Sequence, residues 1–458
     1  MVGWPWLGVT FDLLRDPLGL LERMGREDGA ISEMRYWRGS RVLLNDPALI
    51  EQVLVLQHQK FIKGVLLRLT AQRLLGQGLL TSEGELWRRQ RRLAQPAFQR
   101  ARLAAYAPAM VELTREQAAD WRHGETHDMA AEMMNLSLRV AMRTLFGVEP
   151  KSESRAVGQA LTAIMRRDLR RLRSPLRLPA AFPSPANRRA ERGYALLEST
   201  VTRIIEEKRR DGAASDDLLS RLVEASGEDG ARMSPRQVRD ETMTLLLAGH
   251  ETTALALAWT WYLLAQNPLA ETRLHDEVDR TLAGRLPAPG DLDRMPYLAA
   301  VIQEALRLYP PAYTIGRSSI EPIELGGYHF PKDTVFLISA WVTQRDPRYF
   351  AAPTAFRPER WLGGASPACA APQGESGGAS PRPGAAAAAP EGFRYFPFGG
   401  GPRRCIGQPF ALMEVGLAVA TLASRFRFRL VPGSVVSPEP LVTLRPKDGI
   451  PMIVEERR

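Results

Sequence analysis

A cysteine in a segment rich in glycine and arginine is the residue of this sequence best suited to carry chemistry. Cys405 lies in the run 398–407, which reads FGGGPRRCIG. A thiolate is the softest ligand that a side chain offers to a metal, and nearby positive charges and N–H groups favour its formation. The glycines let the backbone pass close to a flat group and leave N–H groups free to face the sulfur. A helix predicted from Ala411 onwards favours a negative sulfur at its N-terminus. The segment indicates a metal-ligating thiolate, against the commoner alternative of a buried structural thiol.

A second constellation interrupts the most apolar stretch of the chain, which runs from Met243 to Leu264. Residues 248–253 within it read AGHETT. Polar groups in a buried helix cost free energy unless they are paired, and a threonine hydroxyl can pair with the carbonyl four residues earlier. With a glycine beside these groups, the helix is expected to open or bulge locally. One interpretation is a kinked core helix. The other is that Glu251 and Thr252 hand protons to a bound species.

The same stretch is predicted to be a helix buried in protein and not a membrane anchor. An ionised Glu251 at the middle of a bilayer would cost about 3 kcal/mol on insertion scales. The first residues, MVGWPWLG, lack the basic region and apolar stretch of a signal peptide. Two cysteines, Cys369 and Cys405, cannot form a disulfide framework. These features predict a cytoplasmic protein without a transmembrane anchor.

A third motif contains charged residues that are candidates for a buried structural network. Glu304 and Arg307 lie three residues apart and therefore on one face of a predicted helix. Such pairs are common on surface helices, where they contribute little. This helix is apolar, however, and ends at a Tyr-Pro-Pro turn, and a further arginine, Arg360, follows in the segment FRPERW. If the network is buried, Glu304→Ala leaves an uncompensated charge.

Several arginines are suited to bind carboxylates, because a guanidinium is permanently charged and offers two parallel donors. Trp87 and Arg91 lie four residues apart, on one face of a predicted helix. Arg317 follows the Pro-Pro turn, and Arg403 belongs to the cysteine segment. The other arginines in the segment 87–92 are predicted to form a solvated face of the same helix; they are Arg88, Arg89 and Arg92.

The elements that must position these residues are mostly helical. Apolar residues recur at three- and four-residue spacing from about 83 to 310. Short strands are predicted within 30–62 and within 320–337, where Gly326-Gly327 forms a turn. A hairpin is predicted for the segments 441–444 and 451–454 around Lys447-Asp448-Gly449. The chain has no internal repeat, and a single domain over 1–458 is expected, mainly α with small peripheral β-sheets.

One insertion stands apart from this pattern. Residues 363–390 comprise 28 residues, of which 24 are Ala, Gly, Pro or Ser. Such a segment cannot bury enough apolar surface to offset the entropy of ordering it, so a mobile loop is expected. Cys369 lies within it and is predicted to be incidental.

Composition excludes several other classes of protein. The six histidines form no zinc spacing, and no G-x-G-x-x-G follows a predicted strand, so a fused nicotinamide or flavin module is not expected. The net charge of +10 comes without a nucleic-acid-binding motif, so no nucleic-acid partner is predicted. Two interpretations of the charge remain open: a generally basic surface, or a basic face that steers an acidic electron donor.

Taken together, these motifs resemble the cytochrome P450 superfamily, in particular its bacterial soluble members. The cysteine segment matches the family's pattern F-x-x-G-x-R-x-C-x-G, and the other motifs follow the family's order over residues 30–455. The resemblance implies the cytochrome P450 fold, a large helical domain with a β-rich region, and haem b (iron protoporphyrin IX) as cofactor. The sequence departs from the family pattern in two features, the 363–390 insertion and the lack of the N-terminal anchor of microsomal members.

The resemblance also implies a role for each candidate residue. Cys405 would be the axial ligand of the haem iron, and Glu251 and Thr252 would deliver protons, with Thr253 structural. Glu304, Arg307 and Arg360 would support the cysteine loop. The remaining implied haem-binding residues are Trp87, Arg91, Arg317, Phe398, Arg403 and Gly407.

The implied activity is haem-thiolate monooxygenation, which inserts one oxygen atom from O2 into a lipophilic small molecule by hydroxylation or epoxidation. Electrons would come from NAD(P)H only indirectly, through a ferredoxin or flavodoxin and its reductase. Two alternatives remain: a peroxide-driven peroxygenase, and a haem-thiolate sensor or electron carrier without turnover. The peroxygenase branch usually lacks the acid–alcohol pair that Glu251-Thr252 provides. Which lipophilic molecule is the substrate does not follow from the sequence.

Overall fold

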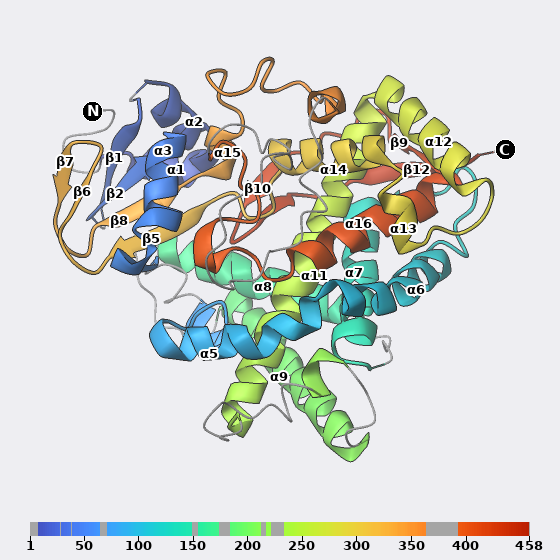
Figure 1. Ribbon diagram of the computed structural model, residues 1–458, viewed down its shortest axis with the longest axis horizontal. Coiled ribbons are helices and arrows are strands. Elements are labelled where there is room, and N and C mark those ends of the chain that lie inside the picture. Colours follow the sequence, from blue (N-terminus) through green and yellow to red (C-terminus); the bar gives the residue numbers. More distant parts are fainter. Residues whose placement is uncertain are drawn as a thin grey trace, which may run out of the picture.

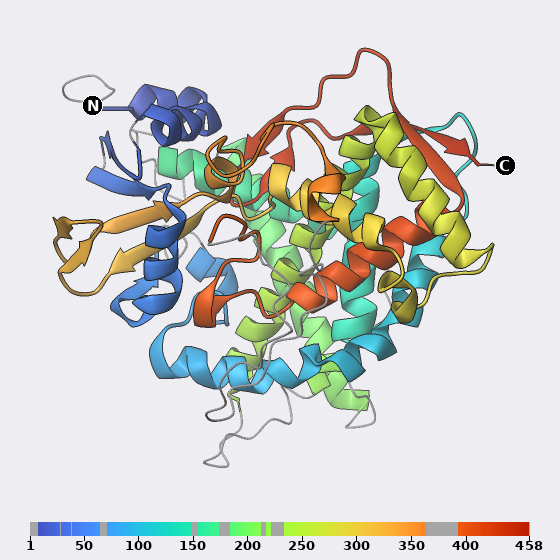
Figure 2. The same ribbon diagram turned by 45° about the horizontal axis from the view of Figure 1, so that its top comes forward.

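The structure is a computed structural model, which describes residues 8–27, 29–37, 39–64, 71–148, 154–173, 184–211, 217–220, 233–362 and 393–457. The predicted loop 363–390 and its Cys369 lie outside these residues. A large helical body and a smaller, strand-rich region lie side by side (Figures 1 and 2). This architecture confirms the expected fold class, mainly α with small peripheral sheets.

Helices form most of the described chain. They are α1 (Thr10–Arg15), α2 (Pro17–Glu27), α3 (Pro47–Glu51), α5 (Gly84–Ala94), α6 (Arg100–Gln117), α7 (Met129–Leu145), α8 (Ser154–Arg173), α9 (Pro185–Asp211), α11 (Pro235–Gln266), α12 (Pro268–Leu282), α13 (Pro289–Leu292), α14 (Pro296–Leu308), α15 (Ala340–Thr343) and α16 (Gln408–Ala423). In the described ranges, none of them combines the length and apolar character that crossing a membrane requires.

Helix α11 runs through the middle of the helical body (Figure 1). A capping box of Ser234 and Gln237 and a proline at the first helical position begin it. It packs against α7, α14 and α16, and most of its residues from Val238 to Leu264 are buried. This confirms that the apolar stretch 243–264 is a helix enclosed by protein.

Four small sheets accompany the helices. The largest has the order β1 (Ile31–Tyr36), β2 (Gly39–Leu44), β8 (Val335–Ile338), β5 (Ile315–Ser319) and β3 (Phe61–Lys63), and only its β2–β8 pair is parallel. A three-stranded sheet contains β4 (Thr126–Asp128), β12 (Pro451–Glu456) and β9 (Phe426–Leu430). The two-stranded sheets are β6 (Ile323–Leu325) with β7 (Tyr328–Phe330), and β10 (Pro438–Pro440) with β11 (Leu444–Pro446). The predicted turn at Gly326-Gly327 joins β6 to β7, and both glycines have positive φ.

The predicted C-terminal hairpin is wrong. The segments around Lys447–Gly449 belong to different sheets, because β11 pairs with β10 whereas β12 pairs with β9 and β4. The fully buried Met452 and Val454 place one face of β12 against the main core. Burial of this face outweighs the local turn signal.

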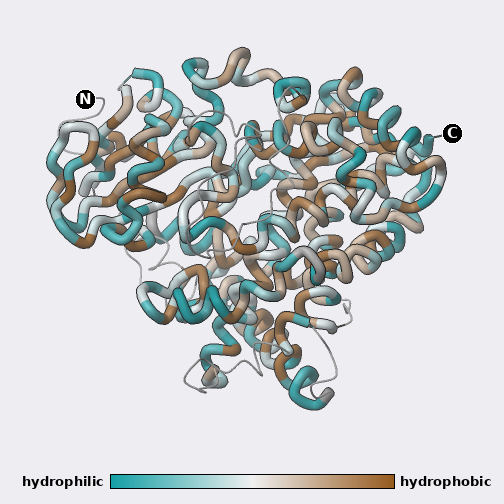
Figure 3. Tube along the Cα trace, in the orientation of Figure 1, coloured by the Kyte–Doolittle hydropathy of each residue, from teal (hydrophilic) through white to brown (hydrophobic). Residues whose placement is uncertain are grey.

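The hydrophobic core is continuous through the helical body and extends to the sheet beside it. One cluster joins residues of α6, α7, α11, α14 and α16, and a second lies between the five-stranded sheet and the helical segment that follows β2. Hydrophobic segments of the chain are concentrated in the interior of the molecule, and many of the outer turns are hydrophilic (Figure 3). The segment that leads into α16 lies between these two cores, beside α11 (Figures 1 and 2).

Candidate active site

The cysteine segment folds back on itself through its own backbone. The N–H of Cys405 donates to the carbonyl of Phe398 at 3.0 Å, and the N–H of Arg404 donates to the carbonyl of Gly401 at 3.0 Å. The N–H of Gly399 donates to the carbonyl of Phe396 at 2.9 Å. These bonds hold Cys405 at the end of a compact loop, directly before α16.

Three consecutive glycines allow this loop to pack closely. Gly399 and Gly401 have φ values of 71° and 63°, which residues with a Cβ rarely adopt. A Cβ on Gly400 would lie 2.0 Å from the ring of Phe393, and one on Gly401 would lie 2.0 Å from the carbonyl oxygen of Leu54. The glycines are therefore required for contact with the protein around the loop as well as for its turns.

The surroundings of the thiol include both opposing and favouring influences on its ionisation. Burial raises the pKa of Cys405, whereas the N–H groups of Gly407 and Gln408 and the charges of Arg91 and Arg404 lower it. Although protein atoms surround the residue, more than a third of its surface is exposed. The residue thus combines exposed surface with N–H groups of Gly407 and Gln408 directed at its sulfur.

Trp87 holds two of the predicted arginines on one side of this loop. The guanidinium of Arg403 lies 4.4 Å from the centroid of the Trp87 ring, and that of Arg91 lies 5.9 Å from it. Arg91 also donates to the carbonyl of Arg404 at 3.0 Å, and Arg403 forms an ion pair with Glu83. The structure thus brings α5 and the cysteine loop together.

A lysine that the sequence analysis missed completes a cluster of cations. Lys63 is directly opposite Arg317 in the β3–β5 pair, and its Nζ donates to the carbonyls of Leu79 and Ser82, both at 2.8 Å. Burial and the charge of Arg403 lower the pKa of Lys63 to about 7 and the pKa of Arg317 to about 10. Lys63 ends a strand of three residues, which is too short to give a sequence signal.

The charge in this cluster is unbalanced. Glu83 accepts from the backbone N–H of Lys63 at 2.7 Å and pairs with Arg403. Among the described residues, neither Lys63 nor Arg317 forms an ion pair with a carboxylate. Buried cations without counter-charges are costly, so the cluster is suited to receive an anionic ligand.

The polar residues in the middle of α11 separate into two environments. The Thr252 hydroxyl donates to the carbonyl of Ala248 at 2.8 Å, and both residues keep exposed surface although the helix is otherwise enclosed. Thr253 donates to the carbonyl of Gly249 at 2.9 Å. His250 Nδ1 donates to the carbonyl of Leu246 at 2.7 Å, and the burial of His250 lowers its pKa. The helix is α-helical throughout, so the expected local opening is not found.

Glu251 is held by two residues that the sequence analysis did not identify. Its Oε1 accepts from the Thr443 hydroxyl and from Nε of Arg445 at 2.9 Å, while Nη2 of Arg445 lies 2.8 Å from the same oxygen. The side chains of Arg445 and Glu251 are only 8% and 6% exposed. Thr443 and Arg445 follow Glu251 by 192 and 194 residues, so no sequence spacing reveals this pair.

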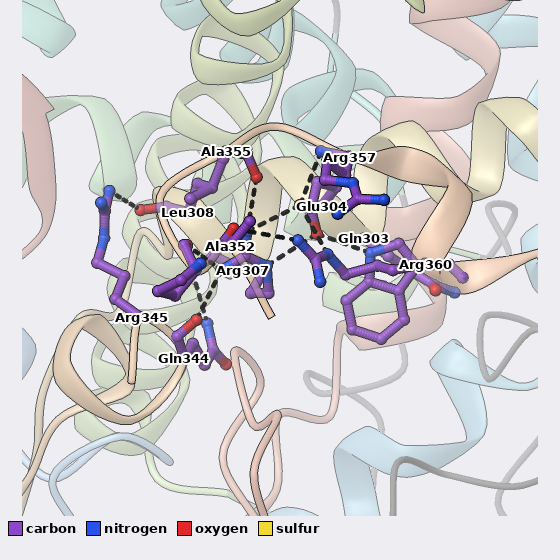
Figure 4. A network of polar contacts seen from close by, with 12 residues as sticks. Gln303, Glu304, Arg307, Leu308, Gln344, Arg345, Ala352, Ala355, Arg357 and Arg360 are labelled. Atoms are coloured by element: carbon purple, nitrogen blue, oxygen red, sulfur yellow. Dashed lines mark hydrogen bonds and ion pairs between the residues drawn. The ribbon is translucent and has the colours of Figure 1, made fainter. Parts of the chain in front are cut away.

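Glu304 is the centre of a fully buried network (Figure 4). It accepts from Nε and Nη2 of Arg307, both at 2.8 Å, and from Nε of Arg360 at 3.0 Å. Trp361 Nε1 and the backbone N–H of Arg357 also donate to it, at 2.9 and 3.0 Å. The structure therefore brings the three predicted charged residues together around one carboxylate.

Gln344 connects this network to the start of the cysteine loop. Its carbonyl accepts from Arg307 at 2.7 Å, and its amide nitrogen donates to the carbonyls of Leu306 and Arg307 at 3.1 Å (Figure 4). Its side-chain oxygen accepts from the N–H of Phe396 at 2.9 Å. Tyr395 donates to the carbonyl of Gln303 at 3.2 Å. Helix α14 and the backbone before the loop are thus joined by direct hydrogen bonds.

Comparison with known proteins places this arrangement in a family. A model of the family described as Cytochrome P450 matches residues 2–451. The chain belongs to the cytochrome P450 family. It is 38% identical to "Cyclooctatin synthase" of Streptomyces melanosporofaciens, over 96% of this chain and 92% of the relative. It is 39% identical to "Cyclooctat-9-en-7-ol 5-monooxygenase" of the same organism, over 94% of this chain and 89% of the relative. It is 33% identical to "Pentalenene oxygenase" of Streptomyces avermitilis, over 96% and 93%.

Membership of the cytochrome P450 family makes the protein a haem-thiolate monooxygenase that depends on redox partners. The residues of the site fit this cofactor. Cys405 could supply a soft sulfur ligand, because it is a free and exposed cysteine. The excess of positive charge from Lys63, Arg317 and Arg403 suits the two propionate carboxylates of haem b.

Proposed function

We propose that this cytochrome P450 oxygenates a cyclic, unsaturated terpenoid. The observation that carries the proposal is the similarity to three proteins over nearly their full lengths. Two of them are named after the compounds on which they act, a cyclic alkenol for the 5-monooxygenase and an alkene for the pentalenene oxygenase.

In this proposal Cys405 is the axial ligand of the haem iron. Trp87 and Arg91 from α5, Arg317 from β5 and Arg403 from the loop hold the propionates, and Lys63 joins them. Phe398 and Gly407 shape the loop, since the carbonyl of Phe398 accepts from Cys405 and the N–H of Gly407 faces the sulfur. When bound through a thiolate, haem activates molecular oxygen, because the thiolate favours cleavage of the O–O bond.

Glu251 and Thr252 are proposed to supply protons from the α11 side. The reaction consumes O2, two electrons and two protons, and it leaves one oxygen atom in the substrate and one in water. Thr252 Oγ1 lies on the accessible face of α11 beside Ala248, where it can pass a proton into the site. Oε2 of Glu251 is the carboxylate oxygen that Arg445 and Thr443 leave unengaged. Glu304, Arg307 and Arg360 are proposed to hold the loop through Gln344.

The electron donor is proposed to be an acidic ferredoxin or flavodoxin, reduced by its own reductase at the expense of NAD(P)H. Arg88 and Arg92 on α5 and Arg404 in the cysteine loop are all exposed on the side of the loop. Complementary charge of this kind accelerates association with an acidic partner. A cytoplasmic location and a single domain over 1–458 complete the proposal.

The function is tested by reconstitution with a surrogate ferredoxin, its reductase and NADPH under labelled O2. Cyclic terpene alkenes and linear fatty acids are compared as substrates, and mass spectrometry detects the products. We expect one labelled oxygen atom in a terpene product, and a red-shifted Soret band from the reduced carbon monoxide complex. Faster turnover with peroxide than with the reductase would favour a peroxygenase. Binding of terpenes without any oxygenated product from either route would favour a sensor or carrier.

A further inference from the structure

Arg445 occupies an unusual place between the proposed proton donor and a helix on the surface. Its Nε and Nη2 lie 2.9 and 2.8 Å from Oε1 of Glu251 in α11. Its Nη1 donates to the hydroxyl of Thr162 in α8. One guanidinium therefore touches both α11 and α8, while its own backbone belongs to β11.

The backbone around Arg445 is firmly anchored. Trp259 Nε1 donates to the carbonyl of Leu444 at 2.9 Å, and the N–H of Leu444 donates to the carbonyl of Pro311 at 2.9 Å. Tyr313 donates to the carbonyl of Leu441 at 2.9 Å. Because the strand cannot shift easily, the position of the guanidinium is set by its two side-chain contacts, with Glu251 and with Thr162.

The two oxygens of Glu251 are in different situations. Oε1 is engaged by Thr443 and Arg445, whereas Oε2 has no hydrogen-bond partner among the described residues. The carboxylate is nearly fully buried. A buried charge is costly unless it is paired and hydrogen-bonded. Arg445 provides this pairing for Glu251, and it fixes the orientation of the carboxylate.

We propose that Arg445 is a positioning residue of the oxygenation reaction. It holds Glu251 with Oε1 engaged and Oε2 available for proton transfer, and its contact with Thr162 makes this arrangement depend on the position of α8. This inference rests on the proposed role of Glu251 in proton supply. The consequence of losing Arg445 is mistimed proton transfer, in which O2, two electrons and two protons leave as hydrogen peroxide and the substrate stays unoxidised.

The test compares how the electrons of NADPH divide between product and hydrogen peroxide in the reconstituted holoenzyme. Arg445→Met should raise the share that enters peroxide several-fold, and Arg445→Lys should restore part of the coupling because it keeps the charge. Thr162→Val removes only the α8 contact and should raise the peroxide share by a smaller factor. The matched control is Arg457→Met, which breaks the ion pair of Arg457 with Asp279 in α12 and contacts neither α8 nor Arg445. Its division of electrons between product and peroxide should equal that of the wild type.

Infrared difference spectra give a readout independent of turnover. The difference between the wild type and Glu251→Gln isolates the bands of the Glu251 carboxyl group. The difference between Arg445→Met and Arg445→Met/Glu251→Gln should show these bands at another frequency, because Oε1 has lost a hydrogen-bond donor. If Arg445→Met divides its electrons as Arg457→Met does, or leaves the bands of Glu251 unshifted, the inference is wrong. If Arg445→Met does not retain haem, the same comparison is made with Arg445→Lys and Thr162→Val. The inference is then wrong if both variants divide their electrons between product and peroxide as the wild type does.

A single variant separates this inference from the function on which it rests. Glu251→Gln should uncouple the enzyme at least as strongly as Arg445→Met. If Glu251→Gln is fully coupled, the proposed proton role of Glu251 fails. If Glu251→Gln uncouples and Arg445→Met does not, the proton role stands and only the positioning role of Arg445 is lost.

Discussion

Lys63 and Arg317 are cross-strand neighbours, directly opposite each other in the antiparallel pair β3–β5. Like charges in this position destabilise a sheet, and the charge of Arg403 adds to the repulsion by lowering the pKa of both residues. The arrangement is favourable when an anion lies among these cations. This relationship, more than any single arginine, indicates where the propionates bind.

Lys63→Met is expected to weaken haem retention. The variant removes a cation from the cluster and leaves the carbonyls of Leu79 and Ser82 without their donor. Transfer of haem to an excess of haem-free globin measures this, and we expect transfer at least about ten-fold faster, which corresponds to roughly 1.4 kcal/mol. Lys60→Met is the control, because Lys60 is an exposed lysine three residues earlier that pairs with Glu321. Equal transfer rates for the two variants would contradict the assignment of Lys63.

Glu304→Ala is expected to give protein that folds poorly and contains little haem. It leaves Arg307, which is fully buried, and Arg360 without their shared carboxylate, a loss of about 3–5 kcal/mol in the free energy of unfolding. Glu359→Ala is the control, since it breaks a half-exposed ion pair with Arg273 and should cost at most about 1 kcal/mol. Urea unfolding and the haem-to-protein ratio measure both. A stable, haem-replete Glu304→Ala protein would refute the supporting role of the network.

Glu414→Gln is expected to remove a pH dependence of stability. Both carboxylate oxygens of Glu414 are buried, and burial raises its pKa to about 8 although the neighbouring Ser137 hydroxyl acts to lower it. The folded protein therefore keeps this proton between pH 4.5 and 8 while the unfolded chain releases it, so stability falls as pH rises through that window. The slope from this group approaches about 1.4 kcal/mol per pH unit.

Unfolding by urea at several pH values measures this slope for the wild type and the variant. The difference between the two proteins isolates the contribution of Glu414 from that of other groups. Glu414→Gln should be the more stable protein at pH 8 by a few kcal/mol and nearly equal to the wild type at pH 4.5. Parallel stability curves for the two proteins would mean that Glu414 is not held protonated by the fold.

Arg92→Glu is expected to slow reduction by an acidic ferredoxin several-fold at low salt. Arg92 is exposed on α5, beside the cysteine loop, and charge reversal there weakens steering of the partner. Arg280→Glu is the control, since it makes the same change of net charge on α12, on the opposite side of the molecule (Figure 1). Stopped-flow reduction measures both, and the effect should shrink at high ionic strength because salt screens exposed charges. Equal slowing by both variants would point to net charge alone.

The motifs that indicate the family and its haem-thiolate chemistry could be recognised from the amino-acid sequence alone. The glycine-rich run before Cys405, the polar interruption within an apolar helix and the spacing of Glu304 and Arg307 are local features. They are readable because helical periodicity and the stereochemistry of glycine act between residues that are close in the chain. The predominance of helix over strand was readable for the same reason.

The residues that contact these motifs from distant parts of the chain became known from the three-dimensional structure. Lys63 joins the cation cluster through strand pairing with Arg317, and Arg445 reaches Glu251 from 194 residues away. The C-terminal strands joined separate sheets, against their turn signal, because burial of Met452 and Val454 depends on the whole core. Ion pairs and burial are contacts between distant segments, so their partners are set by packing, which spacing along the chain does not encode.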